Sequence, residues 1–177
     1  NEEQVMLRDA AAGFLAEKAT VANLRALRDS GSERGFSDDV WNEMAQMGWA
    51  GIAIPESYGG LGYGYTGLGL VLEQVGRNLS ASPLQSTVLV AATVIGELGN
   101  EQQKETLLPA IAAGEKIVSL ALQEGPHHAP AQCAASARLE NGQYVVDGAK
   151  VLVLDAVAAD TFIVIARTGG KPGDEQG

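Results

Sequence analysis

Glycines in the segment 62–67 have the spacing of a turn that binds the phosphates of a dinucleotide. The segment reads Gly62-Tyr-Gly-Tyr-Thr-Gly67, and a helical pattern follows it. Such a turn directly follows a strand and needs an acidic residue about twenty positions later, at the end of a second strand. Here Pro55 and Tyr58-Gly59-Gly60 precede the glycines, and the region near Thr87 is an apolar helix. We therefore expect the glycines to shape a loop that enters a helix, and nicotinamide binding ranks behind this interpretation.

The pair His127-His128 could hold a metal ion or relay a proton, because imidazole titrates near neutral pH. Adjacent residues of a strand point to opposite faces, and no cluster of cysteine, histidine and aspartate surrounds the pair in the sequence. We predict no metal site. Cys133 has no second cysteine as a disulfide partner, and no histidine outside this pair could serve as its base. We interpret Cys133 as a small, buried apolar residue.

Composition excludes several classes of protein. The 177 residues are enough to bury a core, and the formal net charge of −10 opposes general binding to nucleic acid. No apolar run approaches the roughly 20 residues of a membrane span, and the N-terminus lacks the pattern of a signal peptide. The sequence therefore predicts a soluble cytoplasmic protein with one cysteine and no internal disulfide.

Hydrophobic residues recur every three or four positions in the first two thirds of the chain, as in amphipathic helices. Ser37, Thr66 and Asn100 are candidate N-caps, and Pro83 fits the first position of a helix. The pattern predicts one long helix near the N-terminus and four shorter helices. The expected ranges are 5–27, 38–47, 67–75, 84–98 and 101–113.

The period changes at Lys116, where short apolar runs typical of strands begin. Asn141-Gly142 is a strong signal for a hairpin turn. The sequence therefore predicts an α+β chain, with an all-helical domain at residues 1–115 and the beginning of an antiparallel β domain at 116–177. The expected strands are 117–122, 135–139, 143–146, 151–154 and 161–165.

The segment from Gly48 to Leu61 combines an apolar run, a proline stop at Pro55 and a Tyr-Gly-Gly turn. Alone, it could be a tight turn between two helices. Further motifs follow in order, and together they resemble the acyl-CoA dehydrogenase family from Glu3 to Arg167. Residues 148–155 and 173–177 resemble the small-subunit type of pimeloyl-CoA dehydrogenase. The further motifs are residues 100–109, 113–115, 120–124, 146–150 and 159–167.

The resemblance implies an FAD-dependent oxidoreductase that introduces an α,β double bond into an acyl-CoA thioester. It implies a helical domain followed by the start of an antiparallel β-barrel, with the segment 51–62 as one wall of a dry slot for the acyl chain. Four residues occupy positions that contact the flavin in the family. These predicted cofactor-binding residues are Leu120, Leu122, Gln123 and Leu152.

The catalytic base of the family is a glutamate in a C-terminal helical domain that this sequence does not contain. We therefore name no catalytic residue, although Glu73 and Glu124 could be mistaken for one. Glu73 stands one helical turn before Arg77, and we expect the two to form an ion pair. Because family chains are considerably longer, we expect the sequence to be part of a longer polypeptide.

Two departures from the family pattern affect the predicted flavin site. The usual Pro-Gly-x-Gly-Ser-Asp loop is replaced by the segment 125–130, in which Pro126 and Pro130 lack amide donors. The usual Trp-Ile-Thr motif is replaced by Val151-Leu-Val153. These losses favour an alternative, in which the chain is a flavin-free or flavin-poor partner subunit of a heteromeric acyl-CoA dehydrogenase.

Both hypotheses imply the same kinds of partner. The substrate is an acyl-CoA, and the histidine pair at 127–128 is expected to face its anionic CoA part. Electrons would pass to an electron-transfer flavoprotein or another acceptor. The protein is expected to form a homo- or hetero-oligomer.

Overall fold

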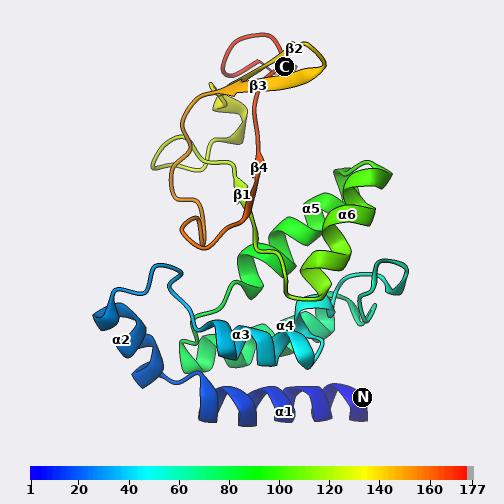
Figure 1. Ribbon diagram of the computed structural model, residues 1–177, viewed down its shortest axis with the longest axis vertical. Coiled ribbons are helices and arrows are strands. Elements are labelled where there is room, and N and C mark those ends of the chain that lie inside the picture. The colour runs from blue at the N-terminus through cyan, green and yellow to red at the C-terminus, as the bar shows by residue number, and fades with distance from the viewer. Residues whose placement is uncertain (175–177) are drawn as a thin grey trace.

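The computed structural model describes residues 1–174, with most helices at one end of the molecule and the strands at the other (Figure 1). Residues 175–177, the end of the predicted domain 116–177, lie outside the described residues. No helix within residues 1–174 is long and apolar enough to cross a membrane. The α-helices are α1 (Glu2–Lys18), α2 (Val21–Ser30), α3 (Asp38–Gln46), α4 (Gly64–Asn78), α5 (Ala92–Leu98) and α6 (Glu101–Ala112).

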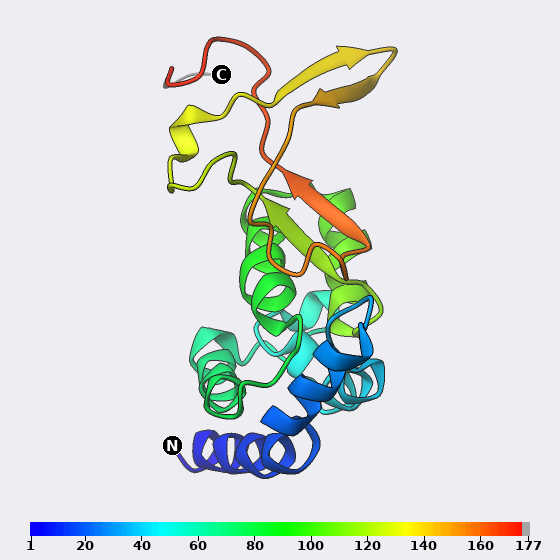
Figure 2. The ribbon, with the colours of Figure 1, turned by 90° about the vertical axis from the view of Figure 1, so that its left-hand side faces the viewer.

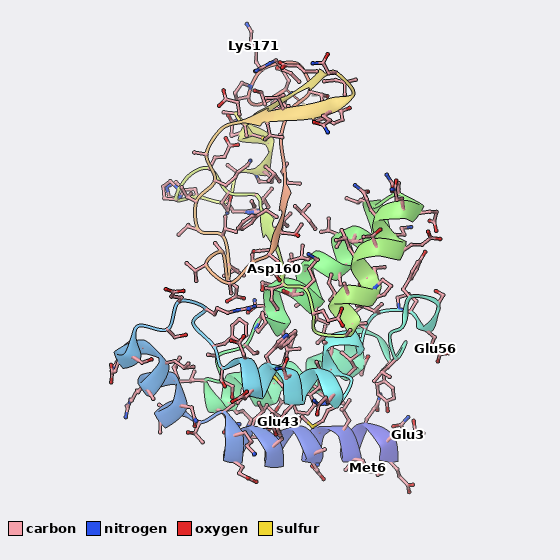
Figure 3. The ribbon with its side chains drawn as sticks, in the orientation of Figure 1. Glu3, Met6, Glu43, Glu56, Asp160 and Lys171 are labelled. Carbon is pink, nitrogen blue, oxygen red and sulfur yellow. The ribbon has the colours of Figure 1, made fainter. Side chains whose placement is uncertain are left out.

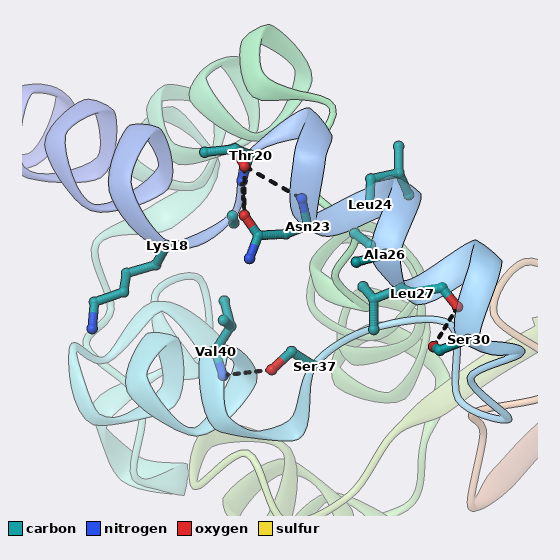
Figure 4. Close-up of a pocket in the computed structure, with 11 residues that line it drawn as sticks. Lys18, Thr20, Asn23, Leu24, Ala26, Leu27, Ser30, Ser37 and Val40 are labelled. Atoms are coloured by element: carbon teal, nitrogen blue, oxygen red, sulfur yellow. Dashed lines mark hydrogen bonds between the residues drawn. The ribbon is translucent and has the colours of Figure 1, made fainter.

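The predicted helix 5–27 is wrong, because the chain breaks into α1 and α2 at Ala19 and Thr20. Thr20 is extended, and its side chain accepts a hydrogen bond from the Asn23 amide, which starts a second helix (Figure 4). A residue from a distant part of the chain also stabilises the break, because the buried Ser80 hydroxyl donates a hydrogen bond to the Ala19 carbonyl at 2.6 Å. Hydrophobic spacing alone does not reveal such a break, because it continues across the cap.

Two other predicted caps hold, and one does not. The Ser37 hydroxyl accepts from the Val40 amide, and Asn100 forms a reciprocal capping box with Gln103. Helix α4, by contrast, begins at Gly64, so the predicted cap at Thr66 is wrong. The predicted helix 84–98 is present, but its first part is the π-helix η3 (Leu84–Ala91), which runs directly into α5.

Two apolar clusters form the core. The first joins α1, α3 and α4 to the short helix η1 (Trp49–Gly51) through Leu15, Met44 and Leu68, all fully buried. The second packs Ile54 against α5 and α6. Burying one such side chain contributes about 1.5–3 kcal/mol, so these clusters stabilise the helical part far more than its surface ion pairs do.

The strands form two separate pairs. The antiparallel pair β2 (Ser136–Glu140) and β3 (Gln143–Asp147) is the predicted hairpin, with left-handed backbone at Asn141 and Gly142. Strands β1 (Val118–Ala121) and β4 (Thr161–Val164) pair in parallel, which differs from the antiparallel arrangement that we expected. The hairpin lies farthest from α1, and the β1–β4 pair lies beside η3 and α5 (Figure 2).

The strand predicted at 151–154 does not form. Leu152 and Asp155 have positive φ angles of 53° and 51°, which interrupt an extended backbone. Side chains from the neighbouring elements hold this loop instead. The Ser119 hydroxyl donates to the Leu154 carbonyl, and the Ser86 hydroxyl donates to Asp155 at 2.6 Å.

The helical and β parts share their core, although α6 ends at Ala112 and β1 begins only at Val118. Ile117 belongs to the first apolar cluster and Val118 to the second. Asp160, labelled in Figure 3, lies just before β4 and accepts a hydrogen bond from the Ile117 amide at 2.8 Å. The structure describes no closed barrel within residues 1–174, and the domain boundary at 115/116 stays a prediction.

Candidate functional site

The segment 48–62 folds into a tight corner, as its glycines suggest. The Gly62 amide donates to the Ile54 carbonyl and the Leu61 amide to the Gly51 carbonyl, both at 2.9 Å. Gly60 lies so close to Ile54 that a Cβ atom on it would lie 2.0 Å from the Ile54 oxygen. Glycine at position 60 is therefore a packing requirement.

This corner lines a cavity. Ile54, Pro55 and Tyr58 form one side of a space of about 200 Å³, and α4 and α5 contribute Tyr65 and Thr93, whose hydroxyls are hydrogen-bonded to each other. A predominantly apolar space between helices can accept an alkyl group. The predicted wall of an acyl slot thus lies beside a cleft.

The glycines at 62–67 shape the entry to α4, as the sequence analysis expected. The short helix η2 (Glu56–Tyr58), rather than a strand, precedes them. Gly67 is buried against Tyr63, and a Cβ atom on Gly67 would lie 2.3 Å from the Tyr63 ring. This context differs from that of a dinucleotide-binding turn, which needs a strand before the glycines.

The end of β1 lies beside the segment that follows Lys150, which brings together most of the predicted cofactor-binding residues. The Val151 amide donates to the Gln123 carbonyl at 2.8 Å, and the Lys150 ammonium donates to the Leu122 carbonyl at 3.2 Å. Leu122 and Gln123 are half-buried, whereas Leu152 is 72% exposed. The fourth predicted residue, Leu120, lies within β1 and is in register with Ile163 of β4.

Glu124 is the most strongly held ionised group of this region. Its carboxylate accepts from the Lys150 ammonium at 2.6 Å and from the amides of Ala134 and Ala135 at 2.6 and 2.9 Å. Lys150, followed by these amides, lowers the pKa of Glu124 to about 2. A carboxylate with such a low pKa is a poor proton acceptor near neutral pH, so Glu124 is no general base.

Glu124 instead fixes the loop 125–135 against β1. It ties the start of this loop to its end, and Lys150 ties both to the segment beside Leu152. The side chains of Lys150 and Glu124 are only 8% and 18% exposed, so solvent screens their attraction little. Sequence reasoning missed Lys150, because 26 residues separate it from Glu124 and no local pattern joins them.

The remaining candidate groups take modest structural roles. Cys133 is buried, as predicted, and its thiol lies 3.4 Å from Glu124. The ring nitrogen Nδ1 of the exposed His128 lies 3.2 Å from the side-chain amide nitrogen of Gln123.

Within residues 1–174, no three histidine, cysteine, aspartate or glutamate side chains gather as a metal site would require. The ion pair expected between Glu73 and Arg77 is absent from the described part of the chain.

Comparison with known proteins decides the family. The model of the acyl-CoA dehydrogenase N-terminal domain matches residues 1–115. The chain belongs to the acyl-CoA dehydrogenase family. Mitochondrial isovaleryl-CoA dehydrogenase of Bos taurus is 32% identical over 95% of this chain and 40% of its own length. Acyl-CoA dehydrogenase FadE12 of Mycobacterium tuberculosis is 28% identical over 95% of this chain and 43% of its own length.

Solved structures of the family share the fold. A variant of the steroid ACAD Tcur3481-Tcur3483 superposes with a TM-score of 0.83 and is 32% identical, covering 94% of this chain and 45% of that one. The described helical domain and start of a β domain thus correspond to part of an acyl-CoA dehydrogenase. The chain spans less than half the length of these relatives.

Proposed function

We propose that the full-length protein is an FAD-dependent acyl-CoA dehydrogenase that introduces an α,β double bond into an acyl-CoA thioester. Family membership supports this reaction class. The observation that carries the proposal is the hydrogen bond from the Val151 amide to the Gln123 carbonyl. It joins the segment of Leu120, Leu122 and Gln123 to the segment of Leu152.

An apolar surface at this position supports the proposal, because the face of a flavin ring is flat and largely apolar. Leu122 and Leu152 supply hydrocarbon surface, and positive φ at Leu152 turns the chain there rather than continuing the strand. When bound, FAD would accept the hydride that leaves the β-carbon of the substrate. This chain's own part would be to bind and orient the substrate, with the acyl group in the cleft beside Ile54 and Pro55.

The hydrogen bonds that the local polar groups already form within the chain favour a second function, that of a partner subunit without its own flavin. The amides of Ala134, Ala135 and Val151 already donate within the chain. The Gln123 side chain faces His128, and Pro126 has no amide hydrogen. Few donors therefore remain here for a flavin, and a related subunit could supply them. The name Tcur3481-Tcur3483 joins two components, which agrees with heteromeric assembly in a similar protein.

The colour of the purified full-length protein tests the enzyme proposal. The protein is expected to be yellow and to bleach when a saturated acyl-CoA is added without oxygen. A colourless protein that cannot be loaded with FAD and does not bleach would contradict it.

Co-expression with the neighbouring gene product distinguishes the two functions. Flavin is then quantified for each separated subunit. One flavin per copy of this chain excludes the partner-subunit function, whereas flavin found only when both chains are present supports it. Reoxidation by an electron-transfer flavoprotein or another acceptor belongs to either proposal, and the cytoplasmic location stays a prediction.

A further inference from the structure

The loop at residues 151–155, which we call the Leu152 loop, has a backbone that needs support from its surroundings. Leu152 and Asp155 both have left-handed backbone, with φ angles of 53° and 51°. Residues with a Cβ atom disfavour this conformation, so it persists only where other contacts enforce it. The Leu152 side chain is 72% exposed and cannot enforce it by packing within the described residues.

Two serine hydroxyls from neighbouring elements supply these contacts. The Ser119 hydroxyl of β1 donates to the Leu154 carbonyl. The Ser86 hydroxyl of η3 donates to the Asp155 carboxylate at 2.6 Å and lies 3.2 Å from the Pro83 carbonyl. Because hydrogen bonds to a carboxylate are shorter and stronger than those to a neutral carbonyl, Asp155 is the main acceptor. Ser119 therefore holds the main chain of the loop, and Ser86 holds a side chain at its end.

Helix η3 also borders the cleft proposed for the acyl group. Val88, two residues after Ser86, lines that cleft together with Ile54 and Pro55. The helix is a π-helix, and such segments are rare and frequently lie at functional sites. One helix thus borders the acyl cleft and bonds to the Leu152 loop.

We propose that Ser86 and Asp155 are positioning residues for the flavin, because their hydrogen bond holds the Leu152 loop in the shape that receives the cofactor. The inference rests on the proposed FAD-dependent function and deepens it. Neither residue needs to touch the flavin, since Leu152 provides the contact and the bond acts through the loop. A preformed loop loses less conformational freedom when a ligand binds, so the bond should strengthen flavin binding.

Titration of the full-length protein with FAD tests the proposal. The flavin is first removed, and a change in flavin fluorescence then measures rebinding. Ser86→Ala is expected to bind FAD about tenfold more weakly than the wild type, as the loss of one hydrogen bond to a charged group allows. Ser80→Ala is the matched control. The Ser80 hydroxyl is also buried and also donates at 2.6 Å, but to the Ala19 carbonyl, so this variant should bind FAD as tightly as the wild type.

Variants of the acceptor test the same bond from the other side. Asp155→Asn keeps an acceptor oxygen and a residue type that tolerates left-handed backbone. Asp155→Ala keeps neither, and it should bind FAD about tenfold more weakly than Asp155→Asn. In the double variant Ser86→Ala/Asp155→Ala the two losses should not add, because each single change already removes the shared bond.

Hydrogen exchange of the flavin-free protein gives a second readout, which does not depend on the cofactor. The Leu152 loop should exchange faster in Ser86→Ala than in Ser80→Ala or the wild type. Helix α6 should exchange alike in all three, because it has no part in either serine's hydrogen bond. A general loss of stability would instead raise exchange in the loop and in α6 together.

Each outcome decides the proposal. Weaker FAD binding and faster loop exchange in Ser86→Ala, but not in Ser80→Ala, support it. Equal FAD binding by Ser86→Ala and the wild type, equal losses in the two serine variants, unchanged loop exchange, or additive losses in the double variant overturn it and leave the enzyme function intact. If Ser86→Ala does not fold, the contrast between Asp155→Asn and Asp155→Ala decides, and equal binding by these two overturns the proposal. A wild type that does not bind FAD contradicts the proposed function itself, and this inference with it.

Discussion

At the scale of single residues, Glu124 shows how a carboxylate can hold a site together without taking part in proton transfer. Its hydrogen bonds to Lys150 and to the Ala134 and Ala135 amides join three segments that are distant in the sequence. The sequence could place Glu124 beside the predicted flavin-contacting residues, but it could not distinguish an anchor from a base. The partner that decides this role is Lys150, which lies 26 residues after Glu124 in the chain.

Removal of Lys150 should destabilise the protein strongly. In Lys150→Met, the mostly buried Glu124 carboxylate loses its cation, and breaking such a pair costs about 3 kcal/mol or more. Urea unfolding of the full-length protein measures the change. Lys171→Met, at an exposed position, serves as control and should lie within about 0.5 kcal/mol of the wild type. Equal stability of both variants would show that the ion pair is dispensable.

The pH dependence of stability should report Glu124 directly. Because the folded-state pKa of about 2 lies below the ordinary value of 4.5, Glu124 stabilises the fold above pH 4.5, and this contribution disappears as the pH falls toward 2. Glu124→Gln should be less stable than the wild type at pH 7, and its stability should decline less steeply in this acid range. Urea midpoints at a series of pH values provide the test, and parallel curves would contradict it.

At the scale of elements, boundaries depend on caps and close approaches that hydrophobic spacing does not contain. The caps at Ser37 and Asn100 were predictable, because a polar side chain precedes each helix and bonds to its first turn. Thr20 lies inside a continuous hydrophobic pattern, so its role as a cap was missed. Thr66 has the right residue type, yet α4 begins earlier, at Gly64.

A pair of threonine variants should separate these two cases. Thr20→Ala removes the α2 cap and is expected to cost about 1 kcal/mol. Thr66→Ala lies within α4, where alanine favours helix, so its stability should be equal or slightly higher. Thermal unfolding followed by circular dichroism compares them. A larger loss for Thr66→Ala than for Thr20→Ala would contradict the observed helix boundaries.

The tight packing of the corner at residues 48–62 leads to a further prediction. Gly60→Ala places a Cβ atom 2.0 Å from the Ile54 oxygen, so the corner must move, at an expected cost of about 2–3 kcal/mol. Gly69→Ala is the matched control, because it lies within α4 with no atom in the way, and it should stabilise the helix by up to about 1 kcal/mol. Calorimetry of both variants checks the contrast, and similar melting temperatures would refute the close packing.

At the scale of the whole molecule, the helical and β parts share buried contacts within the described residues, and we expect them to unfold together. Ile117 and Val118 belong to different apolar clusters. The fully buried Thr87 hydroxyl accepts from the Val118 amide at 3.2 Å and lies 3.1 Å from the Val118 carbonyl. The boundary predicted at residue 115 therefore lies between segments that share buried contacts, and it stays a prediction.

Thr87→Val tests this coupling. The change keeps the shape of the side chain but leaves the Val118 amide unpaired, which is expected to cost about 2 kcal/mol. Because the two parts share a core, far-ultraviolet and tryptophan fluorescence signals should shift to lower temperature together. Loss of the β signal alone would contradict a single cooperative body.

The sequence by itself determined the family, most of the helices, the hairpin at Asn141-Gly142 and the need for glycine in the corner, because these follow from local propensity and ordered motifs. Only the tertiary structure decided the parallel pairing of β1 with β4 and the role of Glu124. Each of these depends on contacts between residues that are distant in the chain. Such contacts leave no periodic or local signal, because the fold alone brings their partners together.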